Sequence, residues 1–176
     1  MAISKIQDAG VSLTGAALPA GSMLQVVSAT KTDTFSMAST SWTDVTGLSV
    51  SVTPTSASSK ILVMINMNWG TNDFRNGSGY QILRNGTAIC IGDAGGSRSR
   101  VTGGWEDNAS TPNYTMFSAA MTYLDSPATT SATTYKIQIK QLDAWGSTYV
   151  NQTGVDVDSV AYPRGASSIT VMEIAG

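Results

Sequence analysis

The chain consists mostly of short segments in which apolar and polar residues alternate. Leu48, Val50 and Val52, for example, alternate with serine and threonine. A period of two places the apolar residues on one face of an extended strand. Clusters of Ser, Thr, Gly, Asn and Asp separate the segments at spacings typical of sandwiches and barrels. The pattern predicts strands over residues 23–27, 48–52, 59–69, 80–83, 88–91, 114–124, 134–142, 147–151 and 168–174.

Two predicted strands, the longest and the last, carry apolar residues on both faces. In the longest, Leu62 and Met64 lie opposite the main apolar row, and in the last, Met172 and Ile174 lie on the second face. A strand that is apolar on both sides is covered on both sides, either within one fold or by a neighbouring subunit. We therefore expect an all-β antiparallel sandwich, and a jelly roll in preference to an up-and-down barrel.

The connections between strands are of two kinds. Asn85-Gly86 lies between two apolar segments and predicts a hairpin with a type I′ turn. Residues 70–79, 92–113 and 143–166 are too long and polar for tight turns, and long loops on a rigid scaffold often carry function.

Composition excludes several functions. Only 12% of the residues are charged and the net charge is −2, so the chain lacks a basic surface for nucleic acid. It has no His, which removes the commonest general base and metal ligand, and we expect no catalytic residues and no cofactor. No apolar run is long enough for a membrane span. The single cysteine, Cys90, is expected to be a buried structural thiol.

The long loops contain aromatic residues beside polar ones, the combination that sugar recognition uses. A glycan site is therefore one hypothesis, and the alternative is that these aromatics fill the ends of the sandwich or lie between subunits. Asp156 and Asp158 are candidate ligands for a hard cation, although solvated loop carboxylates are the favoured interpretation. The candidate glycan-binding residues are Trp69, Asp73, Arg75, Trp105, Trp145 and Tyr149.

With these segments placed, the sequence resembles β-rich, tail-fibre-like domains of structural proteins in tailed-bacteriophage virions. The resemblance covers the chain from about Leu18 to Gly176, and the stretches that carry it are LPAGSMLQVVSATKTDTFS, SWTDVTGLSVSVTPTSASSKILVMINMN, ILRNGTAICIGDAGGSR, LDSPATTSATTYKIQIKQ and ASSITVMEIAG. The order of segments is also similar to trimeric jelly rolls of the TNF/C1q kind. The resemblance implies a trimeric virion protein, assembled in the bacterial host cytoplasm, with its last strand near the three-fold axis.

The same resemblance implies a division of the chain. Residues 1–20 would be an arm that anchors residues 21–176, the sandwich, to other virion proteins. Domains of this kind often follow a long fibre shaft, whereas the arm here has only about twenty residues. The resemblance therefore predicts a small separate component of the virion instead of a long fibre. It would be a tail-fibre or spike tip that binds a host-surface glycan, or a capsid decoration protein. A stand-alone carbohydrate-binding module is the alternative function.

Overall fold

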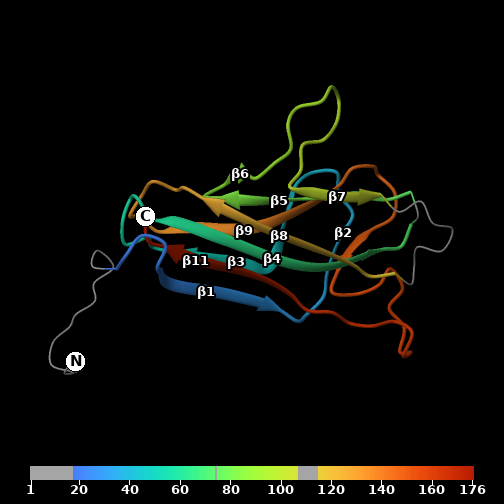
Figure 1. The fold of residues 1–176 in the computed structure, drawn as a ribbon. Helices are drawn as coiled ribbons and strands as arrows, with labels where there is room; N and C mark the ends of the chain where they lie inside the picture. The colour runs from blue at the N-terminus through green and yellow to red at the C-terminus, as the bar shows by residue number, and fades with distance from the viewer. Residues whose placement is uncertain (1–17, 74, 107–114) are drawn as a thin grey trace, which may run out of the picture.

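The computed structural model describes residues 18–73, 75–106 and 115–176, with the backbone alone at residues 105 and 106. These residues form two antiparallel sheets that face each other as a β-sandwich (Figure 1). The all-β prediction is confirmed. The strands are β1 (Met23–Lys31), β2 (Phe35–Met37), β3 (Thr43–Val52), β4 (Lys60–Thr71), β5 (Gly77–Arg84), β6 (Thr87–Ile89), β7 (Gly103–Glu106), β8 (Phe117–Asp125), β9 (Thr133–Gln141), β10 (Thr148–Val150) and β11 (Ser167–Ile174).

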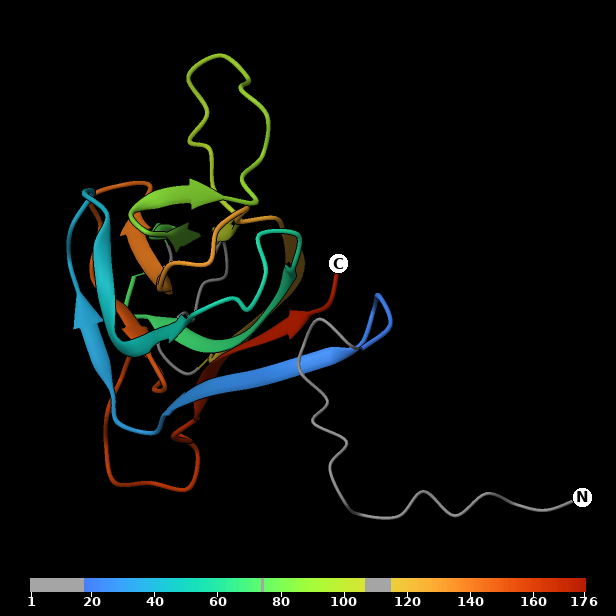
Figure 2. The ribbon, with the colours of Figure 1, turned by 90° about the vertical axis from the view of Figure 1, so that its left-hand side faces the viewer.

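The strands pair in a nested order. The first strand, β1, pairs with the last strand, β11. Strands between these two in the sequence pair with each other in the same way: β3 with β9, β4 with β8, and β5 with both β6 and β7. Sheet A therefore contains β1, β11, β4 and β8, extended by β10 and β2, and sheet B contains β3, β9, β5, β6 and β7. The chain crosses repeatedly between the two layers, which Figure 2 shows in the view turned by 90°.

The core lies between the sheets and follows the alternation of the sequence. β4 contributes every second residue from Ile61 to Trp69, and Tyr135 and Ile139 of β9 face it from sheet B. The predicted hairpin is also present, because β5 pairs with β6 across Asn85 and Gly86. Both turn residues have positive φ, 47° and 86°, as a type I′ turn requires.

The predicted long loops were partly wrong. β4 continues to Thr71 and β5 begins at Gly77, so the first connection is short, and the second contains β7. β10 lies in the third, where a strand over residues 147–151 was predicted. The strand residues that the sequence did not predict are mostly small or polar, such as Gly70, Thr71, Gly77 and Ser78, and neighbouring strands hold them without an apolar alternation. Cys90 is half-buried and not fully buried, because its φ of 52° turns the chain out of β6.

The two ends of the sandwich differ. At one end, here called the terminal end, residues 18–22 lie beside the C-terminus: Gly21 N donates to Ala175 O at 2.7 Å and Ala175 N to Ser22 O at 2.8 Å. At the other end, the loop end, residues 72–73, 75–76, 142–147 and 151–166 meet (Figure 1). Residues 1–17 of the expected arm lie outside the described residues. The described residues contain no helix, and so none that could cross a bilayer.

Candidate functional site

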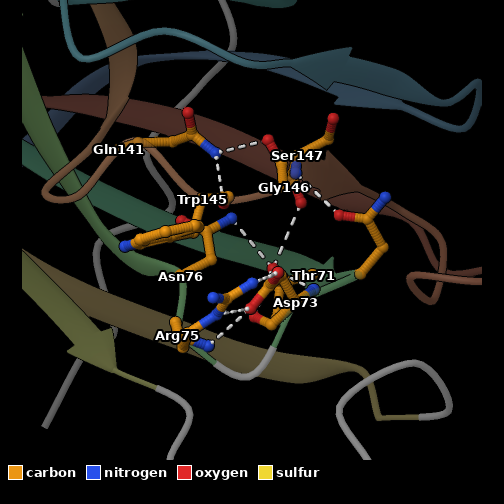
Figure 3. Close-up of polar contacts among 9 residues, drawn as sticks. Thr71, Asp73, Arg75, Asn76, Gln141, Trp145, Gly146 and Ser147 are labelled. Atoms are coloured by element: carbon orange, nitrogen blue, oxygen red, sulfur yellow. Dashed lines mark hydrogen bonds and ion pairs between the residues drawn. The ribbon is translucent and has the colours of Figure 1, made fainter.

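The loop end brings three of the candidate glycan-binding residues, Asp73, Arg75 and Trp145, into one cluster (Figure 3), and Tyr149 is linked to it through Asn72. The Arg75 guanidinium lies 3.8 Å from the centre of the Trp145 ring, within the range of a cation–π contact. Arg75 also pairs with Asp73, donating from Nε to Oδ1 at 2.9 Å and from Nη2 to Oδ2 at 2.8 Å. These bonds, and one from the Arg75 backbone N–H, lower the pKa of Asp73 to about 2. The carboxylate is therefore ionised at neutral pH.

Asn72 connects this group to Tyr149. Its Oδ1 accepts a hydrogen bond from Ser147 N at 2.7 Å, and its Nδ2 donates to the Tyr149 hydroxyl at 3.0 Å. Gly146 permits the approach, since it has φ of 62° and a Cβ there would lie 2.5 Å from Asn72 Oδ1. Sequence reasoning missed Gly146, although a glycine between polar segments is a turn signal.

Hydrogen bonds from buried polar side chains hold the backbone around the cluster in place. Asn76 Nδ2 donates to Thr71 Oγ1 at 2.9 Å and to Thr148 Oγ1 at 3.2 Å. Gln141 Nε2 donates to the carbonyls of Trp145 and Gly146, each at 3.0 Å. These bonds fix the 142–147 loop on the ends of β4 and β9. Trp145 is thus held in place while 48% of its surface remains exposed, which is the arrangement of a preorganised aromatic platform.

The other candidate residues are not part of this platform. Trp69 is 2% exposed and packs edge-to-face on Tyr80 in the core, with ring centres 5.9 Å apart. Trp69 continues the inward row of β4, and its burial agrees with the alternative of an aromatic that fills the sandwich. The side chain of Trp105 lies outside the described part of the structure.

Asp156, one of the two candidate cation ligands, is paired with an arginine. Both Asp156 oxygens accept hydrogen bonds from Arg164 Nη2 at 2.6 Å, so an arginine already balances that charge. Among residues 18–73, 75–106 and 115–176, no group of three or more Asp, Glu or Cys side chains is placed to hold a metal ion.

A second candidate surface is the outer face of sheet A. Val26 lies opposite Met172, Met172 opposite Leu62, and Leu62 opposite Leu124, so one apolar row crosses four strands. We call these four residues the apolar row. Val26 and Leu124 are 48% and 53% exposed. Met64, two residues after Leu62 on the same face of β4, is a further exposed apolar residue beside the apolar row. Sequence reasoning found the members from β4 and β11 and missed those from β1 and β8.

The outer face of sheet B is polar by contrast. Asp44 accepts hydrogen bonds from Lys136 Nζ at 2.6 Å and from Gln138 Nε2 at 2.7 Å. Gln81 Nε2 in turn donates to Gln138 Oε1 at 2.8 Å. Water can hydrogen-bond to the polar side chains of sheet B but not to the apolar side chains of sheet A. The outer face of sheet B is therefore suited to solvent, and the outer face of sheet A is suited to contact with another apolar surface.

Comparison with models of known protein families and with curated proteins gives no match to this chain. The functional argument therefore depends on the two surfaces themselves.

Proposed function

We propose that the chain is a non-enzymatic structural protein of a bacteriophage virion, whose sandwich assembles as a homotrimer and displays its loop end. The apolar row carries this proposal. Single exposed apolar residues are common on soluble proteins, but here four lie in register on adjacent strands. A cyclic oligomer would bury the same row from each copy.

The strand order supports a jelly roll within this proposal. A long antiparallel hairpin that rolls up into two sheets pairs its first strand with its last and its second with its next to last. The pairs β1 with β11, β3 with β9, β4 with β8 and β5 with β7 have this order. The row on β1, β11, β4 and β8 then becomes the inner surface of the trimer, with β11 near the axis.

The difference between the two ends of the sandwich supports anchoring at one end and display of the loops at the other. Residues 18–22 and the C-terminus lie at the terminal end, opposite the loops of the loop end. An arm of residues 1–20 would hold other virion proteins at one end while the loops face outward. Three loop ends on one rigid head would strengthen weak adhesion through effective concentration. We place the protein in the virion, assembled in the bacterial host cytoplasm, with neither nucleic acid nor membrane as partner.

Native mass spectrometry of the full chain at low micromolar concentration tests the assembly. We expect trimers for the natural chain and monomers for the Val26→Asp/Leu124→Asp variant, because burial of unpaired carboxylates costs several kcal/mol. Val157→Asp/Val160→Asp is the matched control, since both of its positions are exposed on the 151–166 loop. A monomeric natural chain, or a trimeric Val26→Asp/Leu124→Asp variant, would refute the proposal.

Trp145 favours adhesion to a glycan over capsid decoration, because its ring is held exposed by Arg75 and the loop bonds. We expect Trp145→Ala to weaken binding to purified host-surface polysaccharide by about tenfold, the magnitude of one ring contact. Titration calorimetry would measure this change, with Trp145→Phe as a variant that keeps a ring and part of the affinity. Equal affinity of the natural chain and Trp145→Ala would exclude this residue from the site. Binding by a monomer would favour a stand-alone carbohydrate-binding module.

A further inference from the structure

Some cationic side chains of this acidic protein form ion pairs with carboxylates, and others do not. All Lys and Arg residues except Lys5 lie in the described ranges. Five of them, Lys31, Arg75, Arg84, Lys136 and Arg164, pair with an aspartate. The other four, Lys60, Arg98, Arg100 and Lys140, have no ion pair with any described carboxylate.

Three of these four cations lie in, or in contact with, one projecting loop. Arg98 and Arg100 belong to residues 92–101, a hairpin that projects from the edge of sheet B (Figures 1 and 2). Lys140 belongs to β9, which β5 separates from β6 and β7, and its Nζ donates to Ser99 Oγ at 3.1 Å. The same ammonium lies 5.1 Å from the centre of the Trp42 ring. The hairpin thus carries two guanidinium groups and contacts one ammonium, which in turn lies near one indole.

The hairpin has an internal framework that limits its motion. Gly92 N donates to Val101 O at 3.0 Å and closes the base. Arg100 Nε donates to Gly92 O at 2.7 Å, and Arg98 Nη1 donates to Gly95 O at 3.3 Å. Each guanidinium uses part of its donor set on the backbone and retains other N–H groups for a ligand. Since the arginines are already tied, a ligand would lose less side-chain entropy on binding them.

The chemistry of the ligand follows from this combination. Guanidinium groups bind carboxylate and phosphate oxygens in a defined geometry, and an aromatic ring packs on the apolar face of a sugar. Serine hydroxyls and the carboxylate of Asp93, in the same hairpin, can pair with sugar hydroxyls. We propose that residues 92–101, with Lys140 and Trp42, form a binding site for an acidic saccharide, separate from the Trp145 cluster.

The proposal concerns one face of the sandwich and does not depend on trimer formation. Asp93 and Asp143 lie near the three cations in sequence, and neither forms an ion pair with them. The site therefore keeps an excess of positive charge in a chain whose net charge is −2. Such exposed charges are screened by salt, so binding should weaken as ionic strength rises.

The test uses the full chain and titration calorimetry at low salt. Oligogalacturonate supplies carboxylates, a phosphorylated mannan supplies phosphates, and neutral dextran supplies neither. We expect binding to at least one acidic probe and none to dextran. Arg98→Gln/Arg100→Gln should weaken that binding by about tenfold, the result of losing two exposed charge contacts. Which of the two acidic probes binds more tightly then identifies the anionic group.

A charge-matched variant and a ring variant complete the design. Lys60→Gln/Arg164→Gln removes two cations elsewhere and should change affinity by less than about twofold. Trp42→Ala should weaken binding of the saccharide and leave binding of inorganic polyphosphate unchanged. No binding of either acidic probe, an equal loss in the charge-matched variant, or equal affinity for single-stranded DNA would overturn the proposal. Native mass spectrometry of the same samples reports trimer formation separately, so failure of one proposal is distinguishable from failure of the other.

Discussion

Replacement of Asp125 by alanine is expected to lower the free energy of unfolding by about 3–5 kcal/mol. Asp125 is buried at the end of β8 and accepts hydrogen bonds from Arg84 Nη1 at 2.8 and 3.0 Å. The Tyr135 hydroxyl donates to its Oδ2 at 2.7 Å. Arg84 and Tyr135 belong to sheet B, and Asp125 belongs to sheet A, so this carboxylate joins the two layers. Its loss leaves a buried hydroxyl and a half-buried guanidinium without their acceptor.

In the variant the Tyr135 hydroxyl stays neutral and loses its acceptor, because burial by itself raises the pKa of Tyr135 above its ordinary value. Urea denaturation followed by circular dichroism would measure the change. Tyr135→Phe is the matched control, since it removes one donor and leaves the pair of Arg84 with Asp125, and should cost only about 1 kcal/mol. A loss below about 1 kcal/mol for Asp125→Ala would show that the connection between sheets contributes little.

Replacement of Glu173 by glutamine is expected to destabilise the fold by about 2–4 kcal/mol at neutral pH. Glu173 occupies an inward position of β11 and is fully buried. Its Oε2 accepts a hydrogen bond from Gln25 Nε2 at 2.6 Å, and its Oε1 accepts bonds from Thr55 N at 2.7 Å and Thr55 Oγ1 at 2.8 Å. A glutamine would direct N–H groups at donors on at least one side of this arrangement.

The pH dependence of stability provides a second readout for Glu173. Burial opposes ionisation, but the hydrogen bonds from Gln25 and Thr55 outweigh it and lower the pKa of Glu173. A lowered pKa gives stability that is complete above the unfolded-state pKa, about 4.3, and is lost as pH falls through the folded-state pKa. The natural chain and Glu173→Gln should therefore differ most at neutral pH and converge in acid.

Unfolding curves from pH 7 to pH 2.5 would measure this convergence. Other carboxyls with a lowered pKa, such as those of Asp73 and Asp44, titrate in acid in both proteins and cancel in the difference. Glu173→Ala is a further control that leaves all the donors unmatched, and it should be less stable than Glu173→Gln. A constant difference between the natural chain and Glu173→Gln across the pH range would contradict the role of the ionised carboxylate.

The candidate sites were partly predictable because some of their signals are local. Asp73, Arg75, Trp145 and Tyr149 stand out as aromatic, charged or polar residues near loops. Trp69 likewise has polar residues beside it in the sequence. It nevertheless lies in the core, because it continues the row of inward-facing residues at every second position of β4. A supporting residue such as Asn76 could not be assigned, since its role depends on a contact with Thr148, which is distant in the sequence.

The sequence by itself determined the all-β class, most strands, the inward rows and the turn at Asn85-Gly86, because these depend on alternation and on backbone preferences of adjacent residues. The tertiary structure decided which strands pair and therefore what lies together. The apolar row combines residues from four strands, and the cation site combines a hairpin with Lys140 of β9. Asp125 and Glu173 are buried against the usual preference of carboxylates, because donors from segments distant in the sequence meet them there. No local pattern specifies such partners.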